Sequence, residues 1–77
     1  RNKTMSHPSI LRPGSQSSEV ERLQQDLSTL GYEVEINGNF DAITEVAVKK
    51  FQQQYNLKVD GVVGAQTGQQ LGMALRA

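Results

Sequence analysis

The side chains best suited to ligand binding in this sequence lie at two Asn/Asp-Gly pairs. Asn37-Gly38 is followed by Asn39 and Asp41, and Asp60-Gly61 stands 23 residues after the first pair. Each pair predicts a tight turn that leads into a helix, because Gly and Asn accept a positive φ. Amide and carboxylate groups beside the free N–H groups of a helix N-terminus suit a ligand with carboxylate and amide groups. The alternative is structural, in which the turns only aim the helices.

A tyrosine precedes each turn at the same distance. Tyr32 and Tyr55 each offer a ring face for stacking on a sugar and a hydroxyl for hydrogen bonding. Each also lies at a predicted helix end, where the ring can pack back on the helix as part of its cap. The two roles are compatible, and both stay open.

The turns belong to a longer internal repeat, formed by Ile36–Thr44 and Val59–Thr67. In both copies a β-branched residue precedes the Asn/Asp-Gly pair, and Ala and Thr follow at fixed positions. Repetition at this spacing indicates one supersecondary unit used twice. Thr44 and Thr67 fall in the first turns of the predicted helices, where we expect their hydroxyls to bond nearby backbone or the preceding turn.

Composition and charge exclude several functional classes. The chain has 77 residues, a net charge of zero, no Cys and one His. Nucleic-acid binding normally leaves a basic footprint, which is missing here. We expect no metal site and no cofactor, and a catalytic triad would depend on His7, in a polar stretch without periodicity. No apolar run approaches the roughly 20 residues of a membrane span.

Three amphipathic helices are predicted to position these groups. The first runs from Ser18, which forms a capping box with Glu21, to about residue 30, where Gly31 stops it. The second runs from Asp41, its N-cap, to about residue 55, where Asn56 stops it. The third runs from residue 64 or 65 to about residue 75. The residues expected to face inward from the third helix are Leu71, Ala74 and Leu75.

The predicted fold is all-α, a compact three-helix bundle with an internal turn-helix repeat over residues 10–77, preceded by a disordered tail or linker over residues 1–9. The alternating stretches 33–36 and 58–59 are expected to be short extended pieces that pair briefly at most. Gln24 and Gln52 each follow a core residue, and we expect them to bond loop backbone groups from the edge of the bundle.

The order of these motifs resembles a known family. The pattern is Leu11-x-x-Gly14-Ser15, Val20-x-x-Leu23-Gln24-x-x-Leu27-x-x-Leu30-Gly31-Tyr32, Asn37-Gly38-x-Phe40-x-x-x-Thr44-x-x-Ala47-Val48-x-x-Phe51-Gln52 and Leu57-x-x-Asp60-Gly61-x-Val63-Gly64-x-x-Thr67-x-x-x-Leu71. Over about residues 11–71 it resembles the type 1 peptidoglycan-binding domain, a three-helix module attached to many bacterial cell-wall hydrolases.

The resemblance implies non-catalytic binding of bacterial peptidoglycan, through the glycan strand, the stem peptide or both. It also implies an attached catalytic domain, a monomeric module, and an extracellular, periplasmic or cell-wall-associated location. Because the chain starts with Arg1 and not Met, we expect it to be part of a longer protein. The expected ligand contacts are Tyr32, Asn37, Gly38, Asn39, Asp41, Tyr55, Asp60 and Gly61.

The sequence departs from the family pattern at three positions. Asn37 replaces the usual Asp, Asp41 replaces Gly, and Gly68 replaces a common Trp. The loss of that ring predicts a looser third helix. It also favours the alternative of a protein-docking or spacer module of a larger secreted enzyme, for which an exposed apolar strip would be typical. A polar groove with one aromatic wall would instead favour glycan or stem peptide.

Overall fold

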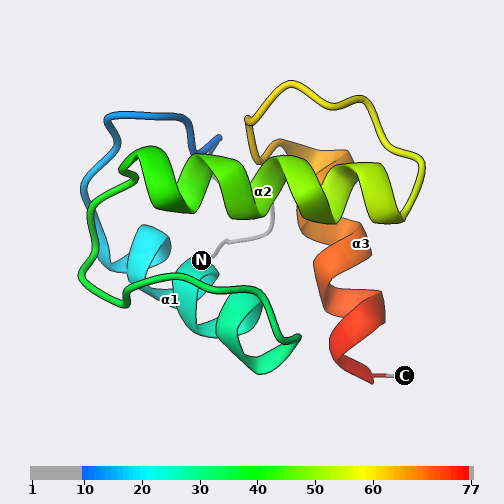
Figure 1. Cartoon of the computed structure of the whole chain (residues 1–77), viewed down its shortest axis with the longest axis horizontal. Coiled ribbons are helices and arrows are strands. Elements are labelled where there is room, and N and C mark those ends of the chain that lie inside the picture. Colours follow the sequence, from blue (N-terminus) through cyan, green and yellow to red (C-terminus); the bar gives the residue numbers. More distant parts are fainter. Residues whose placement is uncertain (1–9, 77) are drawn as a thin grey trace, which may run out of the picture.

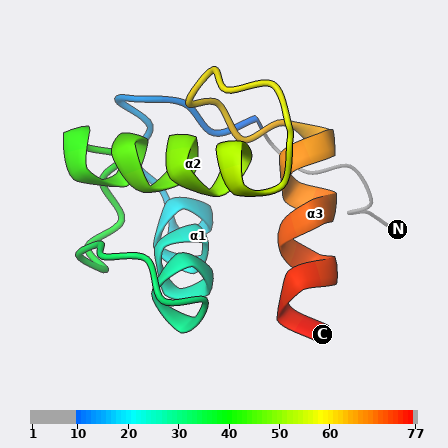
Figure 2. The ribbon, with the colours of Figure 1, turned by 45° about the vertical axis from the view of Figure 1, so that its right-hand side comes forward.

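Three helices joined by long loops make up the computed structural model, which describes residues 10–76 (Figure 1). They are α1 (Ser18–Thr29), α2 (Ala42–Gln54) and α3 (Ala65–Arg76). α1 packs against both other helices, and α2 lies across the upper ends of α1 and α3 in Figure 2. The predicted all-α three-helix fold is confirmed. The tail expected over residues 1–9 lies outside the described residues.

The core lies where the apolar faces of the three helices meet. Phe51 and Leu27 are fully buried at its centre, and Leu71 joins them from α3 with 5% of its surface exposed. The prediction that Leu75 faces inward is wrong, because 38% of its surface is exposed. Leu75 lies in the last turn of α3, one residue before the helix ends at Arg76. The other core residues are Leu11, Val20, Leu23, Phe40, Ala47, Val48 and Val63.

The N-terminus of α1 differs from the predicted capping box. Ser17, and not Ser18, is the N-cap, and its hydroxyl accepts a hydrogen bond of 3.2 Å from the N–H of Val20. A tertiary contact explains why Ser17 is the N-cap and Ser18 is not. The Ser17 N–H donates a hydrogen bond to the carbonyl of Gly38 over 3.1 Å. This bond holds Ser17 in the extended conformation that an N-cap requires.

The C-termini of α1 and α2 both close with the paired hydrogen bonds of a Schellman motif. Gly31 has a φ of 98°, and the next N–H, of Tyr32, donates to the carbonyl of Leu27 over 2.9 Å. Asn56 has a φ of 59°, and the N–H of Leu57 donates to the carbonyl five residues earlier over 2.8 Å. Both predicted stop residues are confirmed.

A short segment before α1 connects the two copies of the repeat. Leu11 pairs antiparallel with Val63 through bonds of 3.0 and 2.8 Å, and Phe40 exchanges bonds of 2.9 Å with Gly14 and Ser15. The brief pairing expected of stretches 33–36 and 58–59 is not found among the described residues. The loops pair with this segment instead, because the buried side chains at positions 11, 40 and 63 draw their backbones together.

We expect Gly68→Ala to stabilise the domain by up to about 1 kcal/mol, because Gly weakens a helix interior by that amount relative to Ala. A Cβ at position 68 would meet nothing within 4 Å. Urea unfolding followed by circular dichroism measures the change. Gly31→Ala is the matched control, and it should destabilise, since its φ of 98° strains an Ala. Equal stability of Gly68→Ala and the parent would contradict the prediction.

Candidate functional site

Each copy of the repeat is built around a buried glutamine from the preceding helix. In the first copy, Nε2 of Gln24 lies 3.0 Å from Oδ1 of Asn37, 2.8 Å from the carbonyl of Asn39 and 3.0 Å from Oγ1 of Thr44. Its Oε1 accepts the N–H groups of Asn37 and Gly38, each over 2.9 Å. One side chain thus fixes both the turn and the start of α2.

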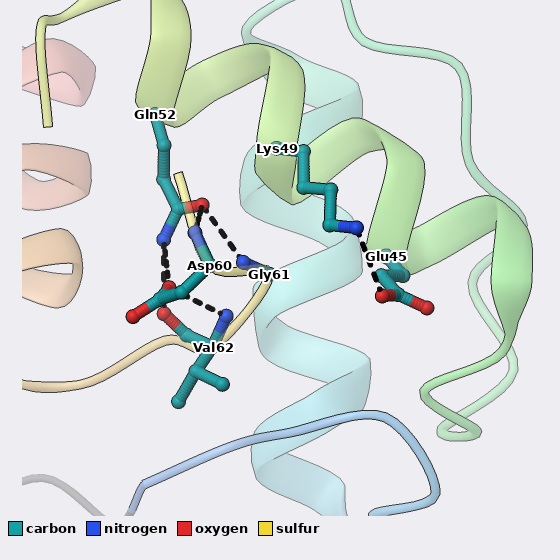
Figure 3. Close-up of polar contacts among 6 residues, drawn as sticks. All are labelled: Glu45, Lys49, Gln52, Asp60, Gly61 and Val62. Atoms are coloured by element: carbon teal, nitrogen blue, oxygen red, sulfur yellow. Dashed lines mark hydrogen bonds and ion pairs between the residues drawn. The ribbon is translucent and has the colours of Figure 1, made fainter. Parts of the chain in front are cut away.

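The second copy repeats this network. Nε2 of Gln52 lies 2.9 Å from Oδ1 of Asp60 and 3.0 Å from the carbonyl of Val62 (Figure 3). It also lies 3.1 Å from Oγ1 of Thr67. Its Oε1 accepts the N–H groups of Asp60 and Gly61 over 3.1 and 3.0 Å. Every partner of Gln52 stands 23 residues after the corresponding partner of Gln24. The two copies therefore correspond residue by residue.

The two glutamines were expected at the edge of the bundle, and this expectation is wrong. Both are fully buried, because the turns wrap over them and supply partners for the whole amide. Their expected bonds to loop backbone groups are confirmed. Both threonine hydroxyls accept from the glutamine side chains, a partner that the sequence did not identify.

Five of the eight expected ligand contacts make these internal bonds, namely Asn37, Gly38, Asn39, Asp60 and Gly61. Gly61 is also packed beneath α2. A Cβ there would lie 3.1 Å from Cε of Lys49 and 3.2 Å from Cγ of Glu45, which form an ion pair of 3.3 Å above it (Figure 3). The φ of 74° favours Gly at this position, and a Cβ would also displace these two side chains slightly.

The two aspartates of the repeat stabilise backbone N–H groups. Asp41 is the N-cap of α2, and the N–H and hydroxyl of Thr44 lower the pKa of its carboxyl below the ordinary 3.8. The N–H of Val62, followed by the amide of Gln52, lowers the pKa of the Asp60 carboxyl below the same value. Both carboxylates therefore favour the folded chain when they are ionised.

We expect the fold to lose stability as the pH falls below about 3.8. The folded pKa of both aspartates is lower than the unfolded one, so their contribution is complete above the unfolded pKa and is lost as the pH falls through the folded pKa. Urea unfolding between about pH 5 and pH 2 measures this slope. Asp41→Asn with Asp60→Asn should flatten it. An unchanged slope in the double variant would contradict the assignment.

Both tyrosines of the predicted site pack on the same core residue. The Tyr32 ring meets Phe51 edge-on, with centroids 6.0 Å apart and an angle of 77°, and the Tyr55 ring lies 4.7 Å from Phe51 at 44°. Burial, followed by the neighbouring Tyr55, raises the pKa of the Tyr32 hydroxyl. The ring of Tyr55 thus packs back on its own helix, as expected of a cap, whereas the ring of Tyr32, which follows α1, contacts α2.

A groove of about 990 Å³ runs between α2 and the segment that follows α1. Ligand pockets in proteins typically measure about 300–1,000 Å³, so its size suits a small ligand or a short piece of polymer. Two aliphatic side chains on α2 stand open in it, Ile43 with 54% and Val46 with 50% of their surface exposed. The lining residues are Gly31, Tyr32, Glu33, Val34, Glu35, Ala42, Ile43, Val46, Ala47 and Lys50.

The groove carries charges of both signs that do not neutralise each other. Glu33, Glu35 and Lys50 all line it, yet none of them forms an ion pair within the described residues. Glu35 accepts a hydrogen bond of 3.3 Å from the side-chain amide of Asn37. Of the eight residues expected to touch ligand, only Tyr32 lines this groove. Asn39 is exposed, and Asp41 directly precedes the lining residue Ala42.

The sequence analysis missed the other groove residues. Of the two neighbours Ile43 and Thr44 at the start of α2, Thr44 is fully buried and Ile43 is exposed. A signal was available, because α3 carries Gln66 and Gln69 at the positions that match Ile43 and Val46. Within residues 10–76 no cluster of acidic residues, His or Cys could hold a metal ion. None of the described helices has the length and hydropathy to cross a membrane.

The family model described as "Putative peptidoglycan binding domain" matches residues 16–71. The chain belongs to this family. The family is a non-catalytic binding domain, which confirms the prediction of a peptidoglycan-binding module in place of an enzyme. The match covers both copies of the repeat and all of α1 and α2. No curated protein gives a match.

Solved structures show how this peptidoglycan-binding domain occurs in relatives. The N-terminal domain of SleB has a TM-score of 0.82 and 34% identity, covering 86% of this chain and 92% of that one. A peptidoglycan-binding protein from Clostridioides difficile, solved with glutamine hydroxamate, has a TM-score of 0.82 and 39% identity, covering 83% and 40%. A fused Zn-dependent amidase/peptidase/peptidoglycan-binding protein from Clostridium acetobutylicum ATCC 824 has a TM-score of 0.80 and 36% identity, covering 83% and 29%. The chain thus spans less than a third of that fusion protein, whose remainder lies outside the shared domain.

Proposed function

We propose that this chain binds bacterial peptidoglycan without cleaving it and holds an attached cell-wall enzyme on its substrate. The observation that carries the proposal is the groove between α2 and residues 31–35, in a chain whose family binds peptidoglycan. Tethering raises the local substrate concentration, so weak binding is sufficient. We expect a Kd from tens of micromolar to millimolar, on the order of 4–6 kcal/mol.

In this proposal, the ligand lies in the groove and contacts Tyr32. Asn39 and Asp41 stand beside the first turn of α2 and remain candidates for a contact at the end of the groove. Tyr55 supports Tyr32 through their shared neighbour Phe51. The Asn37-Gly38 and Asp60-Gly61 turns have a structural role, because their polar groups bind the buried glutamines.

The proposed setting follows from the polymer. Peptidoglycan lies outside the cytoplasmic membrane, so the module would act in the periplasm, in the cell wall or outside the cell. We propose that it works as a monomer, because one copy of the chain supplies every residue that lines the groove.

Co-sedimentation with insoluble peptidoglycan sacculi tests the proposed function, with cellulose and chitin as control polymers. Selective pelleting with sacculi is the expected result. Retention in the supernatant by a chain that is folded by circular dichroism would overturn the proposal.

A second function is favoured by one observation, the exposure of Ile43 and Val46, because exposed aliphatic residues side by side are typical of protein contacts. In this alternative the domain docks on its own enzyme or on a partner protein. The sedimentation assay separates the two functions, since a docking module would stay in the supernatant with sacculi.

A further inference from the structure

The internal repeat supplies a built-in comparison for the groove. Because the two glutamine networks correspond at an offset of 23 residues, positions 42–53 of α2 have counterparts on α3. Three residues that line the groove from α2 differ in chemistry from their counterparts on α3. The pairs are Ile43 with Gln66, Val46 with Gln69, and Lys50 with Met73.

The comparison shows that the fold does not require apolar residues at the two groove positions. Gln66 and Gln69 are exposed and polar, as outward positions of a surface helix normally are. Ile43 and Val46 occupy the same positions with half or more of their surface exposed. About half of each aliphatic side chain is therefore left open in the groove, where a ligand can contact it.

The charges of the groove restrict the chemistry of that ligand. Lys50 stands where the other copy has Met, and the groove also holds Glu33 and Glu35. Opposite charges that line one groove without pairing are complementary to a ligand that carries both a carboxylate and an amine. Exposed aliphatic residues beside them suit small methyl groups.

The two parts of peptidoglycan differ in these properties. The glycan strand consists of N-acetylated sugars, and the lactyl carboxylate of its muramic acid is consumed by the amide bond to the peptide. The stem peptide carries carboxylates, the amine of a diamino acid and the methyl groups of several alanines. Sugar binding would also favour an open aromatic face. The groove offers only Tyr32, whose ring is half-buried and packed edge-on against Phe51.

We infer that the groove binds the stem peptide of peptidoglycan and not the glycan strand. Lys50 contacts a carboxylate of the peptide, Glu33 and Glu35 contact its amine, and Ile43 and Val46 pack on its methyl groups. The inference rests on the proposed peptidoglycan-binding function and identifies the part of the polymer that is recognised.

The test titrates the isotopically labelled chain, followed by NMR, with two soluble probes. One is the pentapeptide L-Ala-γ-D-Glu-L-Lys-D-Ala-D-Ala, and the other is glycan strands from which an amidase has removed all peptide. The expected result is saturable shifts at the amides of the groove with the peptide and none with the stripped glycan. Sacculi pelleting is measured on the same preparation.

Variants in which groove residues of α2 are replaced by their counterparts on α3 test the groove itself. Ile43→Gln with Val46→Gln is expected to weaken peptide binding roughly tenfold, since about 50 Å² of lost apolar contact is worth that factor. Lys50→Met is expected to weaken it about threefold to fivefold, the effect of a solvent-exposed charge contact. Val59→Gln and Lys58→Met are matched controls outside the groove, and they should bind as the parent does.

The outcomes separate the inference from the function on which it rests. Pelleting with sacculi, together with shifts from stripped glycan and none from the peptide, would overturn the inference and leave the proposed function standing. No pelleting and no shift with either probe would overturn both. Unchanged peptide binding by the folded Ile43→Gln, Val46→Gln variant would overturn the assignment to this groove.

Discussion

Gln52→Leu should lower the free energy of unfolding by about 3–5 kcal/mol, since each unsatisfied buried polar group costs about 1–3 kcal/mol. Leu would fill most of the fully buried space of Gln52 but would leave the N–H groups of Asp60 and Gly61 without their acceptor. It would also leave Oγ1 of Thr67 without its donor. Small domains are typically stable by only about 5–15 kcal/mol, so this single change removes a large share of the total.

Urea unfolding followed by circular dichroism measures this loss. Gln53→Leu is the matched control, because Gln53 is the exposed neighbour on the same helix and should change stability by less than about 0.5 kcal/mol. Gln24→Leu should be as costly as Gln52→Leu, because its network is the same. A loss below about 1 kcal/mol for both buried glutamines would show that the turns do not depend on them.

The repeat was predictable from the sequence because its signals are local. Gly31, Asn56 and Asp41 have conformations or capping bonds that depend on a few adjacent residues, and each was placed correctly. The complete burial of the Gln24 and Gln52 side chains was not predictable in the same way. Each stands beside further glutamines in the sequence, and only the path of a turn that returns 8 to 15 residues later covers it.

The groove depends on contacts between distant parts of the chain. Its second wall is the segment 31–35, and the course of this segment depends on the packing of Tyr32 against Phe51. The choice of Ser17 over Ser18 as N-cap has the same origin, in a bond to Gly38. Periodicity predicted that α2 is amphipathic, but not that Ile43 and Val46 would form part of a groove.

Phe51→Ala is expected to lower the free energy of unfolding by about 3–5 kcal/mol, the usual cost of removing a fully buried ring. Phe51 contacts both tyrosine rings, so its loss also removes the surface that fixes Tyr32 at the groove. Phe51→Leu keeps an apolar side chain and should cost less. Urea unfolding ranks the parent, Phe51→Leu and Phe51→Ala in that order of decreasing stability.

The pKa of Tyr32 reports whether Phe51 acts on the groove as well as on stability. Burial is the main cause that raises this pKa above 10.0, so a looser ring in Phe51→Leu should titrate closer to 10.0. A Tyr55→Phe background leaves Tyr32 as the only tyrosine, and its ultraviolet absorbance can then be followed with pH. Peptide binding should weaken in parallel with this change. An unchanged Tyr32 pKa in a destabilised Phe51→Leu variant would mean that the loop holds Tyr32 without Phe51, and the groove would then be independent of the core beneath it.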